Sequence, residues 1–461
     1  MTAARAPAYP NSYRAVWRWH FYAGLFTAPL LIVLTLSGAI YLFDREVDAW
    51  WNRQIQTVAI GRAPLPLAVQ EAALRTALPD AAPVLVRLPH SVDEASIWKV
   101  RRADGSVRDV FLDPYTGQIA GIADPDLQPM NIVRRIHGTL LGGEVGSHIV
   151  ELVACWTLVM LATGIWLWWP RYWKLRGVLV PRLSATGRRF WRDLHAIPGI
   201  VNALLVALLV ASGLPWSAFR GVQFARLGEL MPFVAPSPNF KAPPPAPGAA
   251  AATNPHALHD MAVMAAPQDD KLPWTMRHTP VPAGGGATQI GIADIERLLP
   301  MLDRARFGEG VRISYPKGAQ GVFGISYVPD QAEGQRTIYV DPASGLILGN
   351  TGWADYSPVA KAVEWGVMTH MGRQYGLANQ LANLLVCLVL VAGVVAGIVL
   401  WWCRRPKGNL AAPAQHVGDR LPPTVAGMIA VMAVLFPLVG ASLLLVLGAE
   451  FIARNRPRRR A

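Results

Sequence analysis

Four histidines lie near the ends of apolar segments in two matching sets, His20 with His195 and His137 with His370. Each histidine of the first set precedes one glycine by four residues and a second by 18, and each of the second set precedes a glycine by 27. Neutral imidazole is a standard axial ligand of haem iron. A metal-binding side chain beside a membrane span is costly to keep, which makes it a functional candidate. The repeated spacing therefore favours a duplicated haem-binding membrane module.

The four histidines predict two b haems, each held between histidines of two different helices, as cofactors commonly are in bundle cores. We expect His20 and His195 to share one side of the membrane, and His137 and His370 the other. His148 is a further candidate ligand, because it follows His137 by 11 residues, about three helical turns, and faces a similar way. The alternative is that these histidines only cap or anchor helices at the membrane surface.

The elements that must position these histidines are membrane spans. The chain has 461 residues, of which 52% are hydrophobic and only 16% are charged, below the roughly 25% of soluble domains. Five apolar runs reach the length of about 18 residues that suffices to cross a bilayer. They are 21–43, 152–169, 196–219, 374–402 and 421–449. We therefore predict an α-helical transmembrane bundle with a four-helix core and a fifth span.

Basic residues set the expected orientation, since cytoplasmic loops of membrane proteins carry an excess of Lys and Arg. They gather in the N-terminal arm and in the loops after the second and fourth runs, which predicts that these three parts are cytoplasmic. The basic stretch 454–460 conflicts with this pattern if a fifth span crosses. Anionic lipid beside the spans explains the net charge of +13, so no nucleic-acid partner is expected.

The two long exterior segments repeat one order of elements, a helix followed by three strands and an Asp-Pro turn that ends in glycine. In the first segment these are 65–78, 84–88, 97–101, 107–112 and 113–117. In the second they are 292–302, 311–315, 322–328, 337–340 and 341–345. This internal duplication predicts two small α+β domains, and two units of two spans each that start from the same side of the membrane.

The predicted divisions of the chain follow from these features. They are 1–43 (N-terminal arm and first span), 44–136 (first exterior domain), 137–170 (second span), 171–193 (cytoplasmic loop), 194–219 (third span), 220–369 (exterior insertion and second domain), 370–403 (fourth span), 404–420 (cytoplasmic loop) and 421–461 (fifth span and basic tail).

The chain resembles the PepSY-associated transmembrane family, which includes iron-regulated inner-membrane proteins and bacterial ferric-siderophore reductases. The residues that carry the resemblance are His20-x3-Gly24 with Ser37-Gly38, His195-x3-Gly199 with Ser212-Gly213, His137 with Thr163-Gly164, the Asp-Pro-x-Ser/Thr-Gly turns and Leu272-Pro273-Trp274-Thr275. The resemblance implies a bacterial inner-membrane protein with PepSY-like domains in the periplasm. It also implies b-type haem and the reduction of a ferric siderophore or other ferric chelate, with iron as substrate.

Other functions remain open at this point. The short cytoplasmic loops carry no dinucleotide, flavin or Walker fingerprint, so a reductase would need an external donor such as a quinol or a cytoplasmic reductant. The alternatives are a non-enzymatic PepSY regulator or sensor, and a transporter of iron chelates. A loop near 235–289 also holds a group that could bind copper or iron, or be incidental. Its members are His256, His259, Met261 and Met264.

Overall fold

A computed structural model describes residues 11–170, 175–219, 221–223, 273–277, 281–285, 289–302, 310–318, 320–403, 405 and 421–455. The chain divides into two compact units. The first is helical and comprises 1–40, 134–221 and 381–461, whereas the second contains the sheet and comprises 41–133 and 222–380. Both halves of the sequence contribute to each unit.

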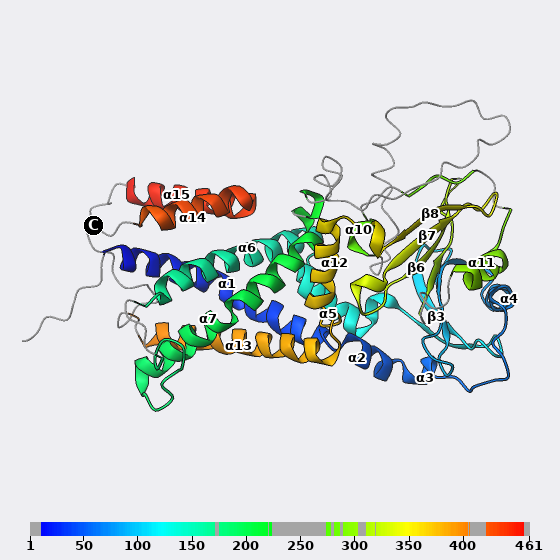
Figure 1. Ribbon diagram of the computed structural model, residues 1–461, viewed down its shortest axis with the longest axis horizontal. Helices are drawn as coiled ribbons and strands as arrows, with labels where there is room; N and C mark the ends of the chain where they lie inside the picture. The colour runs from blue at the N-terminus through cyan, green and yellow to red at the C-terminus, as the bar shows by residue number, and fades with distance from the viewer. Residues whose placement is uncertain are drawn as a thin grey trace, which may run out of the picture. The chain divides into compact units, whose positions relative to one another are not determined.

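Four long apolar helices form the membrane part of the protein (Figure 1). They are α1 (Asn11–Tyr41), α6 (Gly143–Trp168), α7 (Gly187–Gly213) and α13 (Leu377–Trp402). The helices have between 26 and 31 residues, and about 20 residues suffice to cross the hydrocarbon core of a bilayer. The protein is therefore a membrane protein with four candidate spans among its described residues.

A separate short helix that carries one of the candidate histidines precedes each of the spans α6 and α13. These helices are α5 (Pro129–Thr139) and α12 (Pro358–His370). The first break contains Leu140, Leu141 and Gly143 at positive φ, and the second contains Gly372 and Gly376 at positive φ. Left-handed backbone ends a helix, so the spans begin at 143 and 377 instead of at the predicted 137 and 370. The chain is therefore not one continuous helix between His137 and the end of α6.

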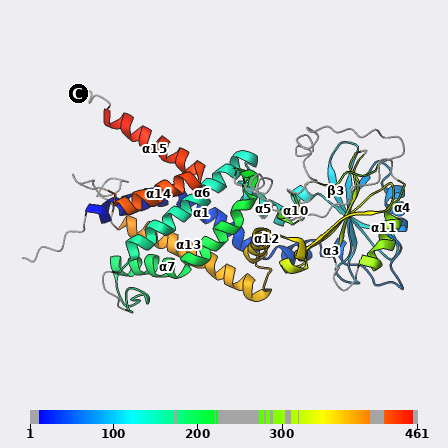
Figure 2. The same cartoon turned by 45° about the horizontal axis from the view of Figure 1, so that its top comes forward.

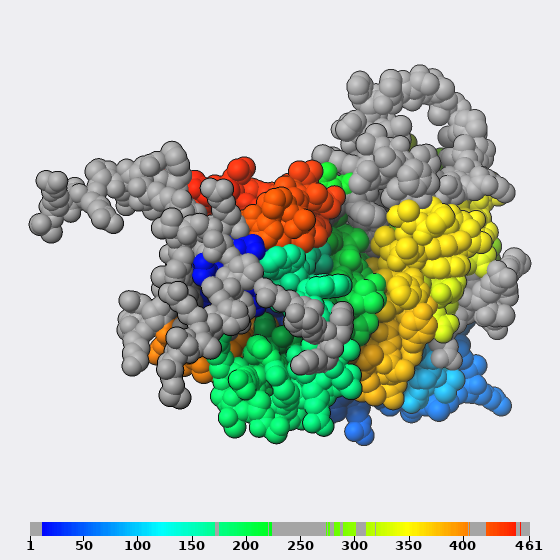
Figure 3. Space-filling view, turned by 60° about the vertical axis from the view of Figure 1, so that its left-hand side comes forward, coloured from blue at the N-terminus to red at the C-terminus, as the bar shows by residue number. Residues whose placement is uncertain are grey.

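The predicted fifth span is wrong. Residues after 421 form two helices, α14 (Pro423–Leu435) and α15 (Pro437–Asn455), which meet at Phe436. Pro437 has no backbone N–H and restricts the residue before it, which ends α14. The apolar parts, Pro423–Leu435 and Pro437–Gly448, are each shorter than a span needs. Both helices pack on α6, where Val439 and Leu443 meet Cys155 and Val159. Figure 3 shows the C-terminal helices in red and orange beside the blue-green surface of this part of the chain.

The two α+β segments share a single antiparallel sheet of eight strands in the order β4-β3-β2-β1-β5-β6-β7-β8. Figure 2 shows this sheet nearly edge-on, with blue strands from the first segment beside yellow strands from the second. The first repeat supplies β1 (Ala82–Arg87), β2 (Ser96–Arg101), β3 (Val107–Leu112) and β4 (Ile119–Ala123). The second supplies β5 (Arg312–Ser314), β6 (Phe323–Tyr327), β7 (Arg336–Val340) and β8 (Ile347–Gly352). They join where Val86 of β1 pairs with Ile313 of β5. The prediction of two separate small domains is thus corrected to two repeats in one sheet.

Sequence patterns missed the outer strands, β4 and β8. Both contain glycine and few β-branched residues, so their strand propensity is low. Gly121 of β4 lies against the Ile55 side chain, and a Cβ there would be 2.3 Å from Ile55. The two predicted Asp-Pro turns are confirmed, with Gly117 and Gly345 at φ of 73° and 72°.

Helices on both faces of the sheet close its core. On one face α4 (Leu67–Ala77) and α11 (Ile292–Leu298) bury Leu74 and Ile295 against Trp98 and Ile338, all of them fully buried. On the other face α10 (Trp274–Arg277) and α12 pack on the second repeat through Met276 and Ala360. The remaining short segments of this unit are α2 (Asp44–Trp51), α3 (Arg53–Gln56), and the 3-10 turns η1 (Pro125–Leu127), η3 (Leu299–Leu302), η4 (Ala332–Gly334) and η5 (Trp353–Asp355).

One of these contacts involves the Pro-Trp-Thr segment that the sequence analysis singled out. Glu364 of α12 is 1% exposed and accepts hydrogen bonds from the backbone N–H and the hydroxyl of Thr275, at 2.8 and 2.7 Å. A buried carboxylate needs such charge-assisted donors. The contact ties α10 to the helix that ends at His370.

Candidate functional site

His20 projects from α1 toward α6. Its Nδ1 lies 2.9 Å from the hydroxyl oxygen of Thr163, and that hydroxyl donates its proton to the carbonyl of Val159 at 2.9 Å. When the hydroxyl proton is given to that carbonyl, Nδ1 of His20 is the donor to the hydroxyl oxygen. In the neutral ring this leaves the lone pair on Nε2, which is the arrangement of a metal-binding imidazole whose other nitrogen is held by a protein acceptor.

His195 projects from α7 toward α13 and is held in the same tautomer by a different acceptor. Its Nδ1 lies 2.7 Å from the carbonyl oxygen of Gly393, which can only accept. The counterpart of Thr163 in the second repeat is Ala396, which has no hydroxyl. The backbone of α13 therefore takes over the role of that side chain, and Nε2 of His195 again carries the lone pair.

The rings of His20 and His195 lie side by side although 175 residues separate them. Their centroids are 6.3 Å apart and their planes make an angle of 72°. Two imidazoles bound on opposite sides of one metal ion, with bonds of about 2 Å, have centroids roughly 6 Å apart. The spacing of this pair therefore fits two ligands of one iron.

The repeated glycines provide the space in which these rings lie. A Cβ on Gly164 would be 3.4 Å from Cε1 of His20, and one on Gly397 would be 3.1 Å from Cε1 and Nδ1 of His195. A Cβ on Gly38 would be 2.9 Å from Cε1 of His137. The absence of a Cβ at these glycines leaves the room that the histidine rings occupy.

His137 lies on α5 and packs against the far part of α1. Its Nδ1 is 2.8 Å from the carbonyl oxygen of Leu34 and 3.3 Å from the hydroxyl of Ser37. Burial lowers the pKa of His137, and the Leu34 carbonyl opposes this effect, so the neutral ring is favoured. Leu34 is 14 residues from His20 on the same helix, which is about 21 Å at about 1.5 Å per residue. The bend after α5 thus shortens the distance of about 40 Å that a continuous helix from 137 to 164 would impose.

The other two candidate ligands have different surroundings. His370 is the last residue of α12 and belongs to the sheet unit, whereas His137 belongs to the helical unit. Their pairing stays a prediction. His148 lies on α6, and its Nδ1 is 2.8 Å from the carbonyl of Glu144, one turn earlier in the same helix. This local bond is typical of a histidine that satisfies its own helix, and the equivalent position in the second repeat is Leu381.

Aromatic and charged residues surround the His20–His195 end of the bundle. Phe21 packs on Trp401 of α13 with ring centroids 5.8 Å apart, and Arg405 lies 3.3 Å above the ring of Trp402. Such aromatics are typical of the membrane–water interface. Asp193, two residues before His195 and 1% exposed, accepts hydrogen bonds from Arg182 at 2.7 and 3.0 Å. This pair fixes the start of α7 and with it the position of His195.

Sequence reasoning did not identify the acceptors that orient the rings. Thr163 directly precedes a repeated glycine, which is the one signal that could have suggested it. The carbonyls of Gly393 and Leu34 have no signal in the sequence, since every residue has a carbonyl. No group of three or more His, Cys, Asp or Glu side chains with metal-site geometry occurs among the described residues. The candidate group at His256, His259, Met261 and Met264 lies outside them.

We expect that Gly397→Ala displaces the ring of His195. The added methyl would lie 3.1 Å from that ring, and overpacking of this kind costs about 1–3 kcal/mol. The thermal midpoint of the purified protein should fall, and its absorbance in the haem Soret region should fall or shift. Gly199→Ala is the matched control, because a Cβ there meets no atom within 4 Å. Equal behaviour of the two variants would contradict the assigned role of Gly397.

Comparison with known families gives a match over most of the chain. The profile of a family described as the PepSY-associated TM region matches residues 17–404. This range contains most of the first candidate span, the whole of the other three, the whole sheet and the five histidines discussed above. No curated protein matches the chain.

Proposed function

Since the chain belongs to the PepSY-associated transmembrane family, we propose that it is a haem-containing inner-membrane reductase. It passes single electrons across the membrane to a ferric siderophore or another ferric chelate in the periplasm. The observation that carries the proposal is the His20–His195 pair, with centroids 6.3 Å apart and both Nδ1 atoms held by acceptors. Such a pair is the ligand set of a b haem, whose iron accepts and releases one electron.

The protein residues have defined tasks in this proposal. His20 and His195 hold the iron through Nε2, while Thr163 and the Gly393 carbonyl fix both rings. His137 and His370 form the second ligand pair, toward the exterior side. His137 contacts α1 at Leu34, which lies about 21 Å along the helix from His20. The two proposed haem sites are therefore separated by about this distance along α1. The electron donor is a quinol or a cytoplasmic reductant.

The orientation follows from the basic residues. With four spans, the N-terminal arm, the loop 169–186 and the segment after 402 lie on one side, which we assign to the cytoplasm. The basic stretch 454–460 conflicted with a fifth span. In the proposed topology the apolar parts of α14 and α15, Pro423–Leu435 and Pro437–Gly448, do not cross the membrane, which removes this conflict. The sheet unit is then periplasmic.

The chemistry at the acceptor is a one-electron reduction of Fe(III) to Fe(II). Fe(II) is bound more weakly by hard oxygen ligands, so the chelator releases the metal for uptake. Iron is therefore the substrate of the reaction as well as the metal of the proposed cofactor. The protein contributes the ligation of the haem and a periplasmic surface where the chelate docks.

The test is an absorbance spectrum of the detergent-purified protein, oxidised and then reduced with dithionite, with a pyridine haemochrome count. We expect a sharp reduced α-band and about two b haems per chain. Anaerobic addition of a ferric hydroxamate or ferric citrate should then reoxidise the reduced protein. A featureless spectrum from haem-replete cells would overturn the proposal and favour a PepSY regulator. Uptake of the chelate into vesicles without any electron donor would favour a transporter.

A further inference from the structure

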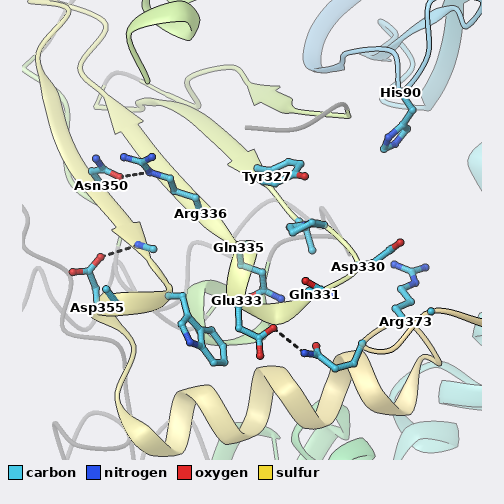
Figure 4. A pocket seen from close by; sticks show the side chains of 18 of the residues that line it. His90, Tyr327, Asp330, Gln331, Glu333, Gln335, Arg336, Asn350, Asp355 and Arg373 are labelled. Atoms are coloured by element: carbon cyan, nitrogen blue, oxygen red, sulfur yellow. Dashed lines mark hydrogen bonds between the residues drawn. The ribbon is translucent and has the colours of Figure 1, made fainter. Parts of the chain in front are cut away.

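The sheet unit contains a polar cavity that the proposed electron transfer does not use. Its volume is about 910 Å³, within the range of about 300–1,000 Å³ that is usual for small-molecule sites. It opens between the end of β6, the turn η4 and the ends of β7 and β8 (Figure 4). Tyr327 and Trp353 supply aromatic surface, and polar and charged side chains together supply most of the remainder.

Gln335 is the residue that indicates a ligand. It lines the cavity and is 1% exposed, yet neither its amide oxygen nor its amide nitrogen has a hydrogen-bond partner. Leaving a buried polar group unsatisfied costs about 1–3 kcal/mol. Figure 4 shows its amide directed into the space between Glu333 and Gln331. A buried amide with a donor and an acceptor both unused fits a ligand that offers the complementary pair, which is another amide.

The turn that carries Gln335 is held in place by other residues. The side chain of Gln374 accepts a hydrogen bond from the backbone N–H of Ala332 at 3.0 Å and donates one to Glu333 at 2.8 Å. Gln374 is itself 4% exposed. The side-chain amide of Gln374 thus fixes η4. The side-chain amide of Gln335 makes no hydrogen bond to this turn.

The cavity is lined by three arginines and by three carboxylates, which are those of Asp330, Glu333 and Asp355. One of the arginines, Arg336, donates a hydrogen bond to the neutral side chain of Asn350. Arg45 is paired with Asp330, and Arg373 with Asp44. Among the described residues, the carboxylates of Glu333 and Asp355 accept hydrogen bonds only from neutral groups. These are the Gln374 amide and the backbone N–H of Gly352. A ligand that places a cation beside its amide group would satisfy both features.

We propose that this cavity binds the N-terminal end of a short peptide. In a peptide the α-ammonium group and the first amide are separated by a single carbon, so one end of the molecule carries the cation and the amide together. Gln335 pairs with the peptide amide, and Glu333 receives the ammonium group, with Asp355 adding to the negative potential. Capture of terminal amines is a known mode of peptide recognition. The inference does not depend on haem or on reduction of a chelate.

The test is calorimetric titration of the full-length protein in detergent with trialanine and with N-acetyl-trialanine. We expect trialanine to bind and the acetylated peptide, which lacks the cation, to bind at least about tenfold more weakly. Glu333→Gln should weaken trialanine by about tenfold and leave the acetylated peptide unchanged. Equal binding of the two peptides, or no binding of trialanine, would overturn the proposal. The proposal would also be overturned if a ferric chelate bound to this cavity and trialanine did not compete with it.

A second variant separates ligand binding from a structural role of Gln335. Gln335→Met keeps the length of the side chain and removes both unpaired polar atoms. The thermal midpoint of the unliganded protein should be unchanged or higher, since no bond is lost, while trialanine binding should fall at least about tenfold. Gln331→Met is the matched control, because Gln331 lines the same cavity but is exposed. A lower thermal midpoint together with unchanged peptide binding would assign Gln335 a purely structural role.

Discussion

If the proposed function is correct, replacement of His20 or His195 by alanine should lower the haem content of the purified protein from the expected two per chain to about one. Each variant removes one of two rings whose centroids are 6.3 Å apart, and the remaining histidine cannot hold the iron from both sides. The single substitutions and the double substitution should give the same loss, because the pair acts as a unit. The pyridine haemochrome count and the low-temperature α-band measure this loss.

The control for this experiment is His148→Ala. His148 bonds the carbonyl of Glu144 in its own helix, so its loss should leave both haem content and spectrum unchanged. Thr163→Val provides a graded test, since it removes the acceptor that orients His20 and should shift the spectrum while retaining most of the haem. Full haem content in His20→Ala and His195→Ala would exclude this pair as ligands.

Val86→Asp unfolds the sheet unit as a whole. Val86 is fully buried at the junction of the two repeats, where it pairs with Trp98 on one side and with Ile313 on the other. An unpaired carboxylate in this core costs several kcal/mol, more than half of the stability of many domains. Hydrogen exchange should therefore become fast in β6 and β7 of the second repeat as well as in β2 and β3 of the first.

The matched control is Val92→Asp, at a position in the same repeat that is 66% exposed. It should leave hydrogen exchange in both repeats as it is in the unsubstituted protein. If exchange in Val86→Asp rose only in the first repeat, the two repeats would be independent domains, as the sequence had suggested, and the shared core would be of no energetic importance.

The sequence by itself determined the membrane class, the four long spans and the repeated order of helix and strands. These follow from local properties, namely the length of apolar runs, the alternation of side chains and the Asp-Pro-x-Ser/Thr-Gly turns. The repeat also identified the histidines, because duplicated spacing is visible in one dimension. The hydropathy of residues 421–449 predicted a fifth span. Two separate helices form there instead, because Pro437 ends α14.

Only the tertiary structure decided what the histidines contact. His20 and His195 come together because α1 and α7 are equivalent helices of two repeats, and no local pattern gives the distance between them. Gly38, Gly164 and Gly397 were evident as repeated residues, but their role depends on which ring faces each of them. The sheet that joins the repeats through β1 and β5 and the unpaired amide of Gln335 likewise arise from pairing and burial between distant segments. The sequence states which polar side chains are present, and the packing of distant segments decides which of them form hydrogen bonds.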